Sequence, residues 1–186
     1  MMTGNEWLSP TRMAGLLSYA LSFGTCAWAW FAEGRRGRPS GEFLPLAAAQ
    51  LGLVLDIAFD IRWKLHDFWM TRAMEMHVYG ERREPQLIAL VVLSGLLLVG
   101  VAWILRRFRA RLGLAIAMSG TMLSIGLWFS EMLSYHFMDA VLYSMVGRLM
   151  LVSFLWLGLA MTTCCGVWLD TASRPSGYRR GAAQRR

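Results

Sequence analysis

The sequence predicts an all-α integral membrane protein built from five transmembrane helices. The first observation is composition, because 56% of the residues are hydrophobic and only 17% are charged, whereas soluble domains carry roughly 25% charged residues. The second is that the apolar residues gather in runs of about 20, the length at which a helix crosses the hydrocarbon core of a bilayer. The third is that many Trp and Tyr residues lie near the ends of these runs, where amphipathic rings prefer the membrane interface.

Five apolar runs define the expected helices. They cover residues 13–32, 43–61, 87–105, 112–133 and 147–169. The second run is the weakest, because Gln50, Asp56 and Asp60 interrupt it. We expect these spans to form one domain over residues 1–170. Residues 171–186 are expected to be a basic, disordered cytoplasmic tail.

Arginine placement predicts the orientation of the helices. Five crossings with the N-terminus outside put two loops and the C-terminal tail on one side, and these contain Arg35, Arg36, Arg38, Arg106, Arg107, Arg109, Arg111, Arg174, Arg179, Arg180, Arg185 and Arg186. An excess of Lys and Arg marks the cytoplasmic side of a membrane, so the C-terminus is predicted to be cytoplasmic. If the second run did not cross, the two arginine-rich loops would face opposite sides.

The same arginines bear on location and partners. They flank apolar runs instead of lining a soluble face, which argues against a nucleic-acid partner despite the net charge of +7. Only Lys64 among the basic residues is a lysine, a bias typical of bacteria with GC-rich genomes. We therefore predict a multi-pass protein of a bacterial inner membrane.

The segment 56–77, "DIAFDIRWKLHDFWMTRAMEMH", leads from the second run into the longest outer loop. It has no Gly or Pro before residue 80, so we expect the helix to continue to about Tyr79. At about 100° per residue, Asp56, Asp60 and Asp67 would form one narrow acidic stripe on this helix.

Ordinary helix ion pairs are the simplest interpretation of the charges in this segment. Asp60 and Lys64 are four residues apart, and Arg72 and Glu75 are three apart, which are the spacings of such pairs. This interpretation explains Asp56 least well, because that acid lies inside the apolar boundary.

Imidazole and carboxylate groups gather on the predicted outer side, which suggests a metal site. The candidate ligands are His66, His77, His136, Asp67 and Asp139. Imidazole is the commonest metal ligand, and nearby Met thioethers would favour copper. Haem b held between His66 and His136 is a variant of this hypothesis.

Two further hypotheses use the same outer surface. Asp56, Asp60 and Glu131 lie near the outer helix ends, where desolvated acids can belong to a proton or small-ion pathway.

A membrane enzyme would use His136 with Asp139, or His66 with Asp67, as a base and its orienting acid. The sequence contains no GxSxG, HExxH or phosphate-binding Gly loop to accompany them. The function we favour is a non-catalytic accessory or complex subunit whose outward-facing cluster of His, carboxylate and Met side chains binds a metal, copper or haem, or docks a partner. It would lie in the bilayer beside other membrane-protein subunits or copies of itself.

Overall fold

The computed structural model describes residues 9–38, 40–75, 83–133 and 136–173. Within these ranges the chain is almost entirely helical, as predicted. The elements are α1 (Pro10–Arg35), α2 (Phe43–Phe59), α3 (Ile61–Glu75), α4 (Arg83–Arg107), α5 (Leu112–Leu133), α6 (His136–Leu142), β1 (Met145–Val146), β2 (Leu149–Met150) and α7 (Leu151–Ser173).

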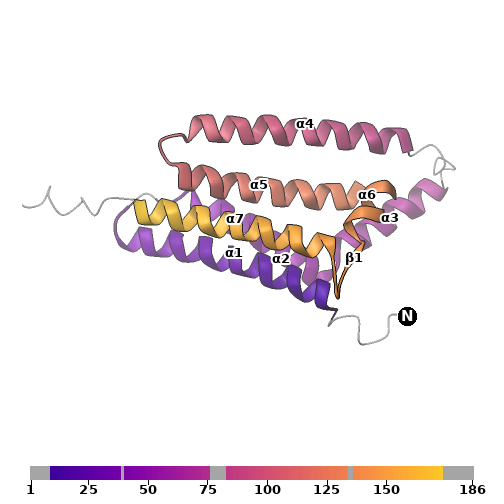
Figure 1. The fold of residues 1–186 in the computed structure, drawn as a ribbon, viewed down its shortest axis with the longest axis horizontal. Coiled ribbons are helices and arrows are strands. Elements are labelled where there is room, and N and C mark those ends of the chain that lie inside the picture. The colour runs from indigo at the N-terminus through magenta and orange to yellow at the C-terminus, as the bar shows by residue number, and fades with distance from the viewer. Residues whose placement is uncertain (1–8, 39, 76–82, 134–135, 174–186) are drawn as a thin grey trace, which may run out of the picture.

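The long helices α1, α2, α4, α5 and α7 run side by side along the long axis of the molecule (Figure 1). The α1–α2 and α4–α5 connections lie at one end, which we call the basic end because it carries Arg35, Arg36, Arg38, Arg106, Arg107, Arg109 and Arg111. The short elements α3, α6 and the β1–β2 hairpin lie at the opposite end, which we call the site end.

Several helices are long and apolar enough to cross a membrane. By length and composition α4, α5 and α7 qualify alone, and the bent pair α2–α3 provides a fourth crossing if it counts as one span. Helix α1 has 26 residues, which extend about 39 Å, but its polar residues leave it outside that group. The all-α architecture is thus confirmed, with three to four candidate membrane-spanning helices among the described residues where five spans were predicted.

Two differences from the predicted spans shape the site end. The fifth predicted span begins at residue 147, but residues 145–150 form the antiparallel β1–β2 hairpin, and α7 begins at Leu151. Gly147 has a φ of 67° in this turn, a conformation that glycine adopts without steric cost.

The second difference is a break at Asp60, where the expected continuous helix bends by 68° between α2 and α3. The predicted acidic stripe of Asp56, Asp60 and Asp67 is therefore wrong, because the helical register does not continue through the bend.

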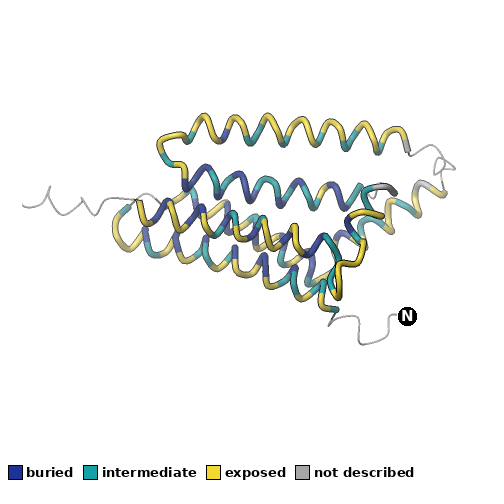
Figure 2. The backbone as a smooth tube through the Cα atoms, in the orientation of Figure 1, coloured by how far each residue is buried: buried dark blue, intermediate teal, exposed yellow. Residues whose placement is uncertain are grey.

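Small residues bring α5 and α7 into close contact at the centre of the bundle. A Cβ atom added at Gly166 would collide with the backbone of Ala117, and one added at Gly113 would collide with the backbone of Asp170. Small residues at helix interfaces allow such close backbone approach inside membranes. Figure 2 shows the result, with α5 largely buried and α4 largely exposed.

We predict that Gly166→Ala destabilises the protein and that Gly158→Ala does not. The added methyl group at Gly166 forces α5 and α7 apart, and overpacking of this kind costs about 1–3 kcal/mol. Gly158 lies on the same helix and meets nothing within 4 Å, so alanine there adds only helix propensity. Thermal unfolding of the two variants in detergent measures the difference, and equal midpoints would contradict the packing argument.

Candidate functional site

The break at Asp60 builds the candidate site by turning the start of α3 back toward α2. Asp60 caps α2 in the left-handed conformation, with φ 54° and ψ 38°, which Asp tolerates better than most residues. The backbone N–H of Arg62 then donates to Asp56 Oδ1 over 2.9 Å. The Asp56 carboxylate therefore satisfies a free N–H group at the N-terminus of α3.

Arg62 joins two buried carboxylates from different helices. Its Nε donates to Asp56 Oδ2 over 2.8 Å, and its Nη1 pairs with Glu131 Oε2 on α5. The three side chains are 8%, 5% and 1% exposed, respectively. Burying one such charge alone costs several kcal/mol, so the cluster is stable only because all three are present.

Trp156 of α7 completes this cluster. Its indole Nε1 donates to Glu131 Oε1 over 3.0 Å, and the Arg62 guanidinium carbon lies 5.4 Å from its ring centroid. Tyr19 of α1 packs against the same indole, with ring centroids 6.4 Å apart. The cluster thereby ties α3, α5 and α7 to the end of α2.

A second ion pair lies beside the cluster, between α1 and the break. Arg12 Nη1 contacts Asp60 Oδ2 at 3.0 Å, and Arg12 Nη2 donates to the carbonyls of Ile57 and Ala58 over 2.8 and 3.0 Å. These two carbonyls belong to the last turn of α2, where carbonyl groups lack helix partners. Asp60 was expected to pair with Lys64, and it pairs with Arg12 instead.

These groups wall a cavity of about 500 Å³ at the site end, which we call the site-end pocket. Its lining comprises Ser9, Thr11, Arg12, Asp56, Ile57, Asp60, Arg62, Trp63, Lys64, Asp67, Glu131, Tyr143, Met150 and Trp156. Burial raises the pKa of Tyr143; Arg62 opposes this rise and Asp139 adds to it. The phenol is therefore a hydrogen-bond donor at neutral pH. The pocket thus offers charged, aromatic and apolar groups together.

The predicted metal ligands are only partly covered by the structure. His66 packs its ring against Trp63, with centroids 6.3 Å apart, and Asp67 lines the pocket. His77 and the side chain of His136 lie outside the described residues. Among the residues that are described, no three His, Cys, Asp or Glu side chains come together as a group that could hold a metal ion.

The predicted proton-pathway acids do come together, but each has an arginine partner. Asp56 and Glu131 share Arg62, and Asp60 pairs with Arg12. Sequence reasoning missed Arg12, Arg62 and Trp156. The only signal for Arg62 was that Asp56 needed a partner, and a separation of six residues does not bring two side chains together on a continuous helix.

Ion pairs also join the helices at the basic end. Arg111 contacts Glu42 at 2.7 Å and Asp170 at 2.9 Å. Burial would lower the pKa of Arg111, but hydrogen bonds with Asp170 and Glu42 outweigh this effect and raise it. Glu33, fully buried, pairs with Arg36 and Arg38. Glu33, Glu42 and Asp170, the acids paired at this end, are therefore each neutralised by a nearby arginine.

Comparison with protein families, with curated proteins and with solved structures finds no match for this chain. The function of the protein is therefore inferred from the geometry of the site.

We predict that Arg62→Gln destabilises the protein by about 3–5 kcal/mol, because it leaves two buried carboxylates without a positive partner. The triple variant Asp56→Asn, Arg62→Gln, Glu131→Gln should recover most of this loss, since it removes the charges together. Thermal unfolding in detergent, followed by circular dichroism, measures both.

Arg72→Gln is the matched control on the same helix. Arg72 pairs with Glu75 at 3.0 Å, but both side chains are 56% exposed, and exposed pairs contribute about 0–1 kcal/mol. If Arg62→Gln unfolded no earlier than Arg72→Gln, the cluster would not hold the site together.

Proposed function

We propose that this chain is a five-span bacterial inner-membrane protein that serves as a non-catalytic accessory or complex subunit. Its N-terminus and site end face the outside, and its basic end and C-terminus face the cytoplasm. The site-end pocket receives a group from a partner subunit or a small ligand. The observation that carries this proposal is the 500 Å³ pocket held open by ion pairs from α1, α2, α3 and α5.

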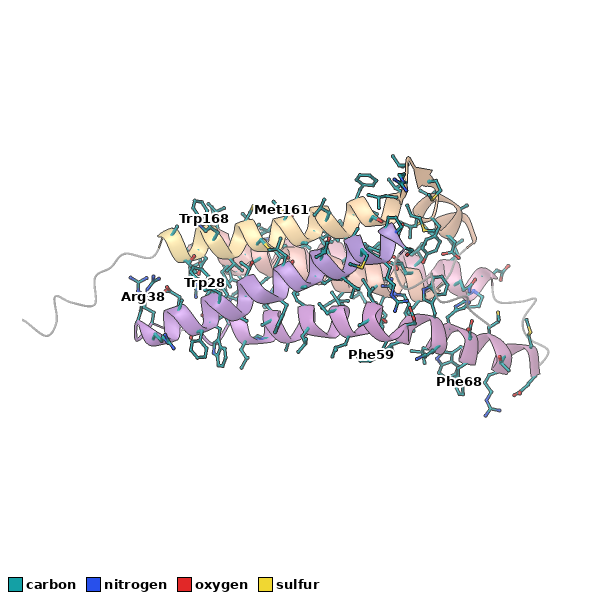
Figure 3. The ribbon with its side chains drawn as sticks, turned by 90° about the horizontal axis from the view of Figure 1, so that it is seen from below. Trp28, Arg38, Phe59, Phe68, Met161 and Trp168 are labelled. Carbon is teal, nitrogen blue, oxygen red and sulfur yellow. The ribbon has the colours of Figure 1, made fainter. Side chains whose placement is uncertain are left out.

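The arrangement of the two ends supports the proposed orientation. The described arginines of two separate connections meet at the basic end, as the positive-inside rule requires of a cytoplasmic face. Trp28 and Trp168, both exposed, lie toward the end where Arg38 is found, and Phe59 and Phe68 lie toward the other (Figure 3). Exposed Trp near a charged boundary is typical of the membrane interface.

The pairing of the buried charges favours a binding role. The proton-pathway hypothesis assumed that burial without a partner disfavours the charged form of Asp56 and Glu131. Both carboxylates instead pair with Arg62, and this pairing offsets the cost of removing them from water. Ion pairs between these side chains hold them in fixed positions, and the same side chains line the pocket. Lys64 and Asp67 remain at its edge, exposed and without an ion pair among the described residues, so they are available to a partner.

The only lysine of the chain provides a test of the orientation. Lys64 is the one lysine in the sequence, so a membrane-impermeant amine reagent has a single side-chain target. We predict that intact spheroplasts label Lys64 at the same rate as opened membranes, read out by mass spectrometry of the peptide. The Lys64→Gln variant controls for background, and labelling only after the membrane is opened would reverse the proposed orientation.

The same reaction tests whether the pocket is occupied. We predict that Lys64 reacts more slowly in native membranes than in purified protein reconstituted into the same lipids, because a bound partner or ligand covers it. Labelling of Lys64 after each preparation is denatured controls for the amount of protein and reagent. Equal Lys64 rates in both preparations would contradict the proposed binding role.

The metal hypothesis has its own test. It predicts that purified wild-type protein retains copper, or shows the Soret band of haem b. Replacing His66, His77 and His136 with Ala should remove the metal, because imidazole supplies most of the proposed ligands; Asp67→Asn and Asp139→Asn should weaken it. Metal-free wild-type protein by plasma mass spectrometry, without a Soret band, would contradict the hypothesis.

A further inference from the structure

An apolar cavity separates α4 from α2 within the bundle. Its volume is about 540 Å³, and we call it the α4 cavity. Its lining comprises Glu42, Pro45, Leu46, Ala49, Leu93, Leu96, Leu97, Ile104, Phe108, Met118, Thr121, Met122, Ile125, Gly126 and Phe129. Glu42 and Thr121 are the only side chains in this lining with hydrogen-bonding groups. The cavity therefore suits a hydrocarbon group.

One-sided packing of α4 creates this cavity. Helix α4 packs mainly on α5, with Gly126 against Leu97 and Gly100 against Met122. Only 6% of its most apolar window is buried inside the protein. The glycines fix α4 close to α5, and another flank of α4 lines the cavity opposite residues of α2. Most of α4 is exposed (Figure 2).

Positive charge lies at the basic end of the α4 cavity. Phe108 lines the cavity, and the guanidinium carbon of Arg107 lies 5.7 Å from its ring centroid. Arg106 and Arg109, next to Arg107 and Phe108 in the sequence, are also exposed, and none of the three arginines has an acidic partner among the described residues. Glu42, the one acid in the lining, already pairs with Arg111 at 2.7 Å.

We propose that the α4 cavity seats one acyl chain of an anionic phospholipid, with its phosphate held by Arg106, Arg107 and Arg109. The arginines supply charge-assisted hydrogen bonds to phosphate, and basic pockets between transmembrane helices are suited to anionic headgroups.

The lining of the cavity and the charge at its end favour an acyl chain as its occupant. From Leu93 to Ile104 the cavity follows α4 for about 16 Å. Along this length its lining is apolar apart from Glu42 and Thr121. An apolar groove with arginine at one end matches the two parts of an anionic phospholipid, its hydrocarbon chain and its phosphate.

A substitution that fills the cavity with a larger side chain tests whether an acyl chain binds there. Ala49 lines the cavity, and its neighbour Ala48 is exposed on another face of α2, so Ala49→Phe and Ala48→Phe are matched variants. Each protein is purified in mixed micelles containing equal amounts of phosphatidylglycerol and phosphatidylcholine, and bound lipid is measured by native mass spectrometry. Wild type and Ala48→Phe should retain a phospholipid, and Ala49→Phe should lose most of it.

If circular dichroism shows that Ala49→Phe is unfolded, Leu96→Trp narrows the same cavity from α4 and replaces it in the comparison. Equal lipid retention by the filled and control variants would overturn the proposal. So would a wild-type dimer, without bound lipid, that the filling variant converts to a monomer.

A separate experiment tests whether the three arginines hold the phosphate of the lipid. The variant Arg106→Gln, Arg107→Gln, Arg109→Gln should keep a bound lipid but lose the preference for phosphatidylglycerol. Arg35→Gln is the control, because Arg35 lies at the same end and also packs over a phenylalanine, Phe31, at 4.9 Å. A wild-type protein that binds both lipids equally would overturn the assignment of the arginines to a phosphate.

Discussion

The interaction on which this fold most depends is the pairing of buried carboxylates with arginine. Glu33, Asp56, Glu131 and Asp170 are all buried, and each contacts at least one guanidinium group. In an apolar bundle an isolated buried carboxylate costs several kcal/mol, so each needs a positive partner. The ion pairs therefore specify which helix ends meet, and small residues on α5 and α7 then allow those helices to pack closely.

The two ends of the bundle use these pairs differently. At the basic end, Arg111 binds acids from two other segments, Glu42 and Asp170, and the connections there close compactly. At the site end, Arg62 and Arg12 hold the chain on either side of a break. Because α3 leaves at an angle of 68°, the bundle cannot close over it, and a pocket remains. Fold stability and the pocket thus have the same origin.

Only part of the candidate site could be predicted from the sequence. The exposed Arg72–Glu75 pair was predicted from spacing alone and is confirmed at 3.0 Å, because both partners lie within one helix. Asp56 was recognised as an acid in need of a partner, but the partner was not found. The stripe prediction failed because it assumed a regular helix, and Asp60 leaves that geometry with a positive φ.

Hydropathy and charge along the chain were sufficient to predict an all-α membrane protein and most of the long helices, because insertion in a bilayer depends on the length and composition of each segment. They also predicted that the arginines of separate loops would gather at one end. The position of the bend, the Asp56–Arg62–Glu131 cluster and the gap beside α4 were visible only in the folded chain. Each depends on contacts outside regular helical spacing, either across the bend, as for Asp56 and Arg62, or between distant segments, as for Arg62 and Glu131. Periodicity and local propensity do not encode such contacts.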